Sequence, residues 1–177
     1  MKQKFHDVII MEFIVGYNYK NKNQTLDEIR KEILPEFDEL DNTEEQIVDR
    51  DPSHLIVMFE NNQIIGWAIW HESNTREHQK GAPRNEEDIK ILETLSNGQC
   101  EVIELHELWL KKAHRGKGYG KQFFDFFEDF ITSKGYNKLV YYTDNASAIS
   151  ICRKRGYKES YYKDLNWHTF YKVVNAQ

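Results

Sequence analysis

The sequence predicts an α/β (α+β) domain in which helices flank one mixed β-sheet. First, apolar and aromatic runs of strand length alternate with stretches of helical periodicity along most of the 177 residues. Second, two strand-like segments at 54–59 and 64–70 enclose a short polar turn, a pattern typical of a β-hairpin. Third, segment 102–110 leads through a Gly-rich loop into a helical pattern and then a further strand, which indicates a crossover connection.

The same patterns predict the remaining elements. An amphipathic helix is expected at 25–40, kinked or ended by Pro35, but the first 50 residues show no clear opening strand. The polar segment 73–98 predicts an inserted loop with a short helix. The other expected elements are a helix from Thr43 to about Arg50, the strand 102–110, a helix closed by Gly135, the strand 138–143, a helix from Asn145 to Arg155, and a strand pair at 157–165 and 167–174 joined near Asn166.

Length and composition indicate a single folded domain over residues 1–177. Hydrophobic residues make up 40% and aromatic residues 14%, which argues against disorder, and the net charge of −5 argues against a general nucleic-acid binder. No apolar run approaches the roughly 20 residues that span a bilayer. Cys100 and Cys152 lie far apart and form no metal-finger or disulfide pattern. We therefore expect a cytoplasmic protein with no nucleic-acid or membrane partner and no metal site.

The charges are unevenly distributed along the chain. Residues 27–51 contain eleven acidic side chains against three basic ones, whereas residues 111–121 contain five basic side chains and no acidic one. Such stretches are usually solvated faces of the protein. The same polarity also suits an anionic cofactor at one place and a cationic substrate at another.

A Gly-rich basic turn is the strongest functional signal. It reads Arg115-Gly116-Lys117-Gly118-Tyr119-Gly120-Lys121, follows His114 and opens a helix. Unpaired amides at a helix N-terminus and the helix dipole attract anions, and glycine leaves the backbone open to a ligand. The third glycine comes one residue too early for a dinucleotide fingerprint, and no Walker loop is present. A phosphate-binding turn is the favoured interpretation, and a flexible surface turn is the alternative.

On these residues the sequence resembles the GNAT superfamily of N-acetyltransferases. The family signature Gln/Arg-x-x-Gly-x-Gly/Ala is matched by Arg115, Gly118 and Gly120. Leu108-Trp109-Leu110 occupies the position of the family's "Leu-x-Val" strand end. A second family motif about 25 residues later is matched by Asn145, Ala148, Ile149, Ile151, Gly156 and Tyr157. The resemblance covers roughly Ile56 to Val174.

The resemblance implies a fold, a cosubstrate and a set of binding residues. It implies a mostly antiparallel central sheet with a splayed parallel strand pair, here 102–110 and 138–143, and acetyl-CoA as cosubstrate. The pantetheine would pair with the backbone around Trp109, through Leu108 and Leu110. The pyrophosphate would lie on the amides of Gly116, Lys117, Gly118, Tyr119, Gly120 and Lys121, beside Arg115, and Asn145 would contact the cofactor arm.

Acetyl transfer to an amine needs a base, a polarised carbonyl and a proton for the departing thiolate. Glu104 is the expected base: it lies six residues before Leu110, where many family members carry a glutamate, and strand alternation places His106 on its face and Glu107 on the other. A solvated edge-strand carboxylate is the alternative for Glu104. The resemblance implies that the amide of Leu110 polarises the carbonyl.

The general acid is where the sequence departs from the family pattern. The position of the family tyrosine holds Cys152. Its thiol is expected either to protonate the thiolate or to pack as a small core side chain. Tyr157, Tyr161, Tyr162 and water are alternative proton donors.

The acceptor is expected to be a primary amine of a small molecule or peptide. Five aromatic residues form either an acceptor cleft or part of the core: Trp67, Trp70, Trp109, Tyr17 and Tyr19. The acidic segment 27–51 would attract a cationic acceptor, and segment 73–98 would lie over the acceptor site. A non-catalytic acetyl-CoA-binding sensor on the same fold is the alternative function, and the sequence leaves open whether the chain forms a homodimer.

Overall fold

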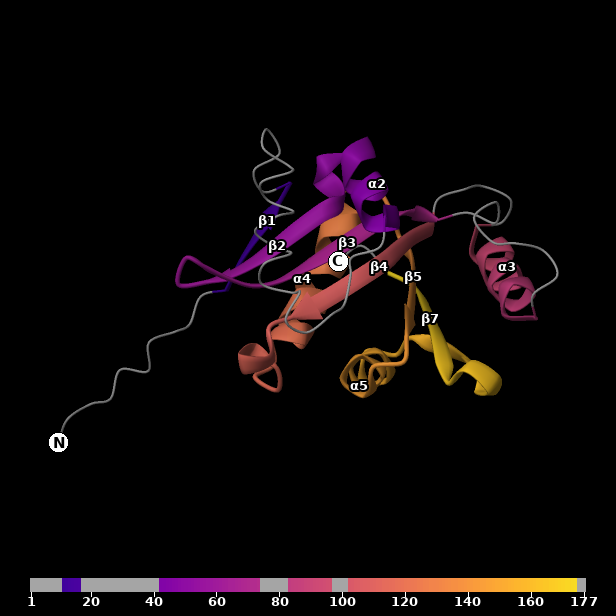
Figure 1. Ribbon diagram of the computed structural model, residues 1–177. Helices are drawn as coiled ribbons and strands as arrows, with labels where there is room; N and C mark the ends of the chain where they lie inside the picture. The colour runs from indigo at the N-terminus through magenta and orange to yellow at the C-terminus, as the bar shows by residue number, and fades with distance from the viewer. Residues whose placement is uncertain (1–10, 17–41, 74–82, 97–101, 175–177) are drawn as a thin grey trace. The chain divides into compact units, whose positions relative to one another are not determined.

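A computed structural model describes residues 11–16, 42–73, 83–96 and 102–174 (Figure 1). Seven strands form one mostly antiparallel sheet in the order β1-β2-β3-β4-β5-β7-β6, with β4 and β5 as a parallel pair and helices flanking the strands. The mixed α/β fold class predicted from the sequence is therefore confirmed. The chain divides into two compact units, one of residues 1–69 and 108–114 and the other of residues 70–107 and 115–177. The single domain over 1–177 and the insertion at 73–98 stay predictions.

The first unit is built on the predicted hairpin. Strand β1 (Met11–Val15) pairs antiparallel with β2 (Leu55–Glu60), and β2 pairs with β3 (Gln63–Ser73), which continues into the second unit from Trp70. Asn61 and Asn62 connect β2 to β3 with φ of 50° and 64°, the left-handed conformation that tight two-residue hairpin turns need. Helix α2 (Asn42–Arg50) packs Ile47 and Val48 into an apolar cluster with side chains of β2, β3 and the end of β4.

The second unit contains the remaining elements. These are α3 (Pro83–Ser96), β4 (Val102–Leu110, which ends in the first unit), α4 (Tyr119–Ser133), β5 (Lys138–Thr143), α5 (Ala146–Lys154), β6 (Lys158–Tyr162) and β7 (Trp167–Val173). Strand β7 lies between β5 and β6 and pairs antiparallel with both.

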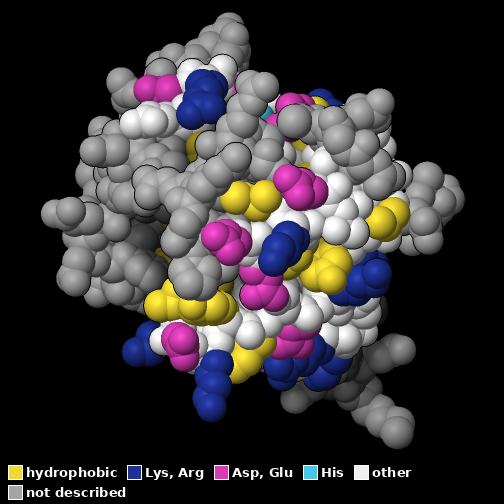
Figure 2. All heavy atoms as spheres, turned by 90° about the vertical axis from the view of Figure 1, so that its right-hand side faces the viewer, with side chains coloured by type: hydrophobic (Ala, Val, Ile, Leu, Met, Phe, Trp, Pro, Cys, Tyr) yellow, Lys and Arg dark blue, Asp and Glu magenta, His cyan; other side chains and the backbone are white. Residues whose placement is uncertain are grey.

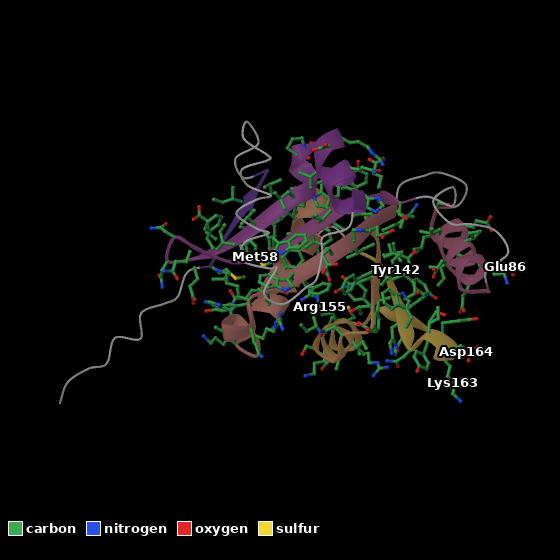
Figure 3. All side chains as sticks on the ribbon, in the orientation of Figure 1. Met58, Glu86, Tyr142, Arg155, Lys163 and Asp164 are labelled. Carbon is green, nitrogen blue, oxygen red and sulfur yellow. The ribbon has the colours of Figure 1, made fainter. Side chains whose placement is uncertain are left out.

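Helices α3 and α4 cover opposite faces of this part of the sheet. On β5, Val140 belongs to the apolar cluster of α3, and Tyr142, which Figure 3 labels, packs against that cluster. The intervening Tyr141 meets Phe124 of α4 in an edge-to-face contact with ring centroids 5.8 Å apart. Because successive strand side chains point to opposite faces, the even-numbered residues of β5 face α3 and Tyr141 faces α4.

Most of the predicted elements are confirmed, with some differences at their ends. The strands at 102–110 and 138–143 have the predicted bounds, and α2, α4 and α5 match their predicted helices. The helix within 73–98 was predicted as short, but α3 runs from Pro83 to Ser96. Strand β1 supplies the opening strand that the sequence did not reveal. The helix predicted at 25–40 lies outside the described residues.

No helix among the described residues is both long and apolar enough to cross a membrane. On the face drawn in Figure 2, acidic and basic side chains of the described residues are interspersed with hydrophobic and uncharged ones.

A buried carboxylate joins α4 to α5 and β7. Glu128 is 7% exposed, and its carboxylate accepts hydrogen bonds from Arg155 Nε and Tyr157 Oη at 2.9 Å and from Lys172 Nζ at 3.0 Å. Arg155, labelled in Figure 3, also pairs with Asp125 of α4. Burial by itself raises the pKa of Glu128, but the hydrogen bonds from Arg155, Lys172 and Tyr157 outweigh it and hold the pKa below its usual value. The charged form of Glu128 therefore stabilises the fold.

We expect this carboxylate to make stability depend on pH. Because the pKa of Glu128 is lower in the folded state, its contribution is complete above the unfolded-state pKa and is lost as the pH falls through the folded-state pKa. Glu128→Gln should destabilise the fold by about 3 kcal/mol at neutral pH, since Arg155 and Lys172 lose their partner. The difference in melting temperature from wild type should stay constant from neutral pH to about pH 4 and shrink as the pH falls further. A difference that stays constant below about pH 4 would contradict the assignment, and Asp129→Asn on the exposed side of α4 is the control.

Candidate functional site

The Gly-rich turn adopts the conformation that its glycines were predicted to allow. After the short helix η4 (Lys112–His114), Gly116 and Gly118 have φ of 75° and 87°, in the left-handed region that side chains other than glycine rarely adopt. Gly118 is the N-cap of α4 and makes no side-chain capping hydrogen bond. The first turn of α4 therefore lacks the side-chain acceptor that usually satisfies its amides, and it contains no acidic residue.

Different structural constraints explain why glycine occupies the three positions of the turn. A Cβ atom at Gly116 or Gly118 would meet no atom within 4 Å, so packing does not require glycine at these two positions. A Cβ at Gly120 would lie 3.0 Å from Ile151 Cδ1, so Gly120 lets the start of α4 approach α5 closely. The turn thus presents open backbone, flanked by the exposed side chains of Arg115, Lys117 and Lys121. This arrangement fits a pyrophosphate group.

Asn145 has a structural role in addition to the predicted cofactor contact. It is the N-cap of α5, and its Oδ1 accepts hydrogen bonds from the amides of Ser147 and Ala148 at 3.0 and 3.1 Å. The side-chain oxygen of Asn145 therefore caps α5. A contact between Asn145 and the cofactor arm stays a prediction.

The parallel pairing of β4 with β5 ends before either strand does. Its register extends from Val102 opposite Lys138 to Leu105 opposite Tyr141, whereas β4 continues to Leu110 and β5 to Thr143. Peptide groups of β4 beyond Leu105 thus lie past the end of the parallel pairing. The pantetheine pairing predicted for this strand falls on that stretch.

The end of β4 is held in the first unit by a close backbone approach that sequence reasoning missed. A Cβ on Gly66 of β3 would collide with the carbonyl oxygen of Trp109 and with the side chain of Leu110. The amide of Lys111 donates to the carbonyl of Ile65 at 2.8 Å. Gly66 therefore positions Leu108 to Leu110, the residues predicted to bind pantetheine and to polarise the thioester, although those two roles stay predictions.

Glu104 lies in a cluster with two histidines. Its side chain is 10% exposed, and Oε1 lies 3.2 Å from Nδ1 of His106 and 3.6 Å from Nε2 of His71. His106 shares the strand face of Glu104, as the alternation predicted. His71 comes from the neighbouring strand β3, 33 positions earlier in the chain, and sequence reasoning missed it because only the strand pairing brings it here.

The two histidines control the charge of Glu104. Burial raises the pKa of this carboxyl, but the hydrogen bonds and charges of His106 and His71 outweigh burial and hold the pKa well below its usual range. The carboxylate is therefore ionised at neutral pH but is a weak base by itself. Its clearest chemical capacity is to orient the two imidazoles and to stabilise a positive charge on them.

Cys152 is completely buried on α5, with 0% of its surface exposed. Burial raises the pKa of its thiol to about 12, so it holds its proton more tightly than an ordinary thiol. Among the alternative donors, Tyr157 donates to Glu128 at 2.9 Å and Tyr161 donates to Asn166 at 3.1 Å. The packing role considered for Cys152 fits this environment better than the acid role, which stays a prediction.

We expect Cys152→Ala to behave as a core substitution. Removal of the buried sulfur should lower the free energy of unfolding by about 1–2 kcal/mol and leave kcat close to wild type. Cys152→Ser should cost at least as much stability because it buries a hydroxyl group. Thermal melts and steady-state kinetics of both variants check this. A kcat at least about tenfold lower in the alanine variant, with the fold intact, would instead support the acid role.

The three predicted cleft tryptophans lie in the core. Trp67 and Trp109 are 2% and 4% exposed and belong to the apolar cluster of the first unit. Trp70 is 4% exposed and meets Phe130 edge to face. Tyr17 and Tyr19 lie outside the described residues. The core alternative is therefore the correct one for the tryptophan side chains.

Comparison with known proteins identifies relatives of the whole fold. The sequence model described as "Acetyltransferase (GNAT) family" matches residues 23–157. No curated protein matches the chain in sequence. Among solved structures, the mosquito arylalkylamine N-acetyltransferase like 5b has a TM-score of 0.66 at 13% identity and covers 93% of this chain and 100% of its own.

Two further structures are similar. The Drosophila melanogaster polyamine N-acetyltransferase, which catalyses the formation of N-acetylagmatine, has a TM-score of 0.64 at 12% identity over 94% of this chain and 100% of its own. The protein yncA from Salmonella typhimurium with its cofactor acetyl-CoA has a TM-score of 0.58 at 13% identity over 94% and 95%. At these identities the likeness establishes the fold alone.

Proposed function

Because this chain belongs to the acetyltransferase (GNAT) family, we propose that it transfers the acetyl group of acetyl-CoA directly to a primary amine of a small molecule or peptide. The observation that carries the proposal is the turn before α4. Gly116 and Gly118 hold left-handed backbone with open space where a side chain would be, beside the uncapped helix N-terminus. Acetyl-CoA supplies the activated acetyl thioester.

Different residues bind the different chemical groups of acetyl-CoA. The amides of Gly116 to Lys121 hold the pyrophosphate, with Arg115, Lys117 and Lys121 adding positive charge. The backbone of Leu108, Trp109 and Leu110 pairs with the pantetheine arm, and the amide of Leu110 polarises the thioester carbonyl. Asn145 contacts the arm through the part of its side chain that does not cap α5.

Glu104 and His106 together take the proton of the attacking amine. A carboxylate oxygen only accepts hydrogen bonds, so His106 donates its Nδ1 proton to Glu104. In that tautomer the lone pair of His106 lies on Nε2, which receives the proton directly or through water. Glu104 stabilises the imidazolium that forms, which resembles the role of the carboxylate in a catalytic triad. The departing thiolate takes its proton from water, because the thiol of Cys152 is buried and holds its proton tightly.

The acceptor is a cationic amine that the protein attracts through its negative charge. The net charge of −5 and the acidic segment 27–51 favour cationic acceptors over anionic ones. The similar Drosophila structure belongs to a polyamine N-acetyltransferase. We therefore place diamines and polyamines first in the panel of acceptors, followed by arylalkylamines and peptide N-termini.

Two assays test the proposal. Competition binding of CoA against ATP and NAD should show that CoA binds most tightly, and free thiol should appear in proportion to the amine added. Tight CoA binding without amine-dependent thiol release would indicate the non-catalytic sensor instead. Equal or tighter binding of ATP or NAD would contradict the cofactor assignment.

A further inference from the structure

We propose that His71, Glu104 and His106 form a binding site for a divalent transition metal ion, with Zn²⁺ as the ion that fits best. Each residue offers one ligand atom, and the three atoms lie within 4.8 Å of one another. Within the part of the chain that the structure describes, this is the one group of three metal-ligating side chains. Sequence spacing alone predicted no metal site, because one ligand comes from β3 and two come from β4. The ion would replace the Nδ1 proton that His106 donates to Glu104 in the proposed acetyl transfer, so the metal-bound form is a separate state in which His106 does not take the proton of the amine.

Two of the three distances between ligand atoms agree with coordination of a single ion. With zinc–ligand bonds of about 2.0–2.1 Å, the ligand atoms of a tetrahedral site lie about 3.3 Å apart. The Oε1 atom of Glu104 lies 3.2 Å from the ring nitrogen of His106 and 3.6 Å from that of His71. Three ligands of this kind bind Zn²⁺ and leave its fourth position to water or another small ligand.

The hydrogen bonding of His71 supplies an independent reason for a cation. Nδ1 of His71 lies 3.0 Å from the carbonyl oxygen of Glu72, which only accepts hydrogen bonds, so Nδ1 carries the proton. In the neutral imidazole, Nε2 then has a lone pair, and it faces the carboxylate of Glu104, which also only accepts. Two acceptors in this position repel each other, so the site needs either a second proton on His71, which would donate to Glu104, or a metal ion between the two groups. A backbone carbonyl on the distal nitrogen is also the usual second partner of a metal-bound histidine.

The surroundings restrict the site without closing it. The side chains of His71, Glu104 and His106 are 15%, 10% and 24% exposed, so an ion can reach them, and the partly buried ligands lose little order on binding. The even-numbered residues of β4 share the face of Val102, which packs with α3, while α4 covers the opposite face. Imidazole and carboxylate ligands favour Zn²⁺ and its neighbours over Mg²⁺ or Ca²⁺.

Direct binding to the full-length protein tests the site. Protein stripped with a chelator should bind one Zn²⁺ by titration calorimetry, and Co²⁺ should give the visible absorption bands of a four-coordinate ion with nitrogen ligands. His71→Ala, Glu104→Gln and His106→Gln should each weaken Zn²⁺ binding by at least about 100-fold. The Co²⁺ spectrum is recorded on the wild-type protein alone. It therefore tests the site even if one of the variants fails to fold.

The matched control is His114→Gln. His114 and Glu60 lie 3.1 Å apart with similar exposure, but within the described residues they belong to no group of three ligands. This variant should bind Zn²⁺ like wild type. Absence of stoichiometric binding in wild type, equal affinity in the three site variants, or equal loss in His114→Gln would overturn the site, and a proton would then be the cation beside Glu104. The assay contains no acetyl-CoA or amine, so its result is separate from that of the acetyl-transfer assays.

Discussion

Glu104→Gln should lower kcat by about 10²–10⁴-fold and leave the affinity for acetyl-CoA unchanged. Glutamine keeps the size of the side chain but loses the charge that stabilises a protonated His106. Glu104 is not among the residues proposed to bind acetyl-CoA, so cofactor binding should persist. Steady-state kinetics with saturating acetyl-CoA measure the first effect, and calorimetric titration of acetyl-CoA measures the second.

The control for this variant is Glu107→Gln, the same change three residues along β4 on the opposite strand face. We expect Glu107→Gln to keep kcat near the wild-type value. Wild-type turnover in Glu104→Gln at neutral pH would remove Glu104 from the proton-transfer step. An equal loss of kcat in both variants would show that kcat depends on the negative charge of β4 in general and not on Glu104 in particular.

Gly118→Asp should abolish the stabilisation of the fold by acetyl-CoA in thermal melts. The aspartate would place a negative charge and a side chain in the open space before α4, where the pyrophosphate is proposed to lie. Wild-type protein should gain about 2.7 kcal/mol at an acetyl-CoA concentration 100 times the dissociation constant. The variant should gain almost nothing at that concentration.

Strain at a positive φ must be separated from the loss of the phosphate site. Gly135, after α4, has φ of 90° and equally open space around a Cβ, but it lies at the other end of the helix. Gly135→Asp should therefore destabilise the free protein without reducing its response to acetyl-CoA. A full acetyl-CoA response in Gly118→Asp would contradict the phosphate-binding turn, whatever the melting temperature of the free variant.

Features that depend on local sequence were predictable. The left-handed turn at Gly116 and Gly118, the hairpin at Asn61 and Asn62, and the start of α5 at Asn145 all follow from the conformational preferences of a few consecutive residues. Alternation along β4 also predicts that Glu104 and His106 share one strand face, and the contact between their side chains agrees with it.

Features that depend on pairing between distant segments were not predictable. His71 lies beside Glu104 only because β3 pairs with β4. The long segment 73–98 separates these strands in the sequence, so the register of their pairing cannot be predicted from a short turn. In the sequence, nothing distinguishes Gly66 from an ordinary strand glycine. Only the fold shows that the backbone of Trp109 lies close against it. The burial of Cys152 and the insertion of β7 between β5 and β6 likewise depend on tertiary packing.

Transfer of an isotopically labelled acetyl group tests the central claim most directly. The purified protein is incubated with labelled acetyl-CoA and each amine of the panel, and the acceptor and free CoA are quantified by mass spectrometry. We predict that at least one primary amine gains a single labelled acetyl group, with one free CoA released per product and almost no product in Glu104→Gln. Release of CoA without an acetylated amine, or no transfer to any amine by a protein that binds acetyl-CoA, would contradict the account.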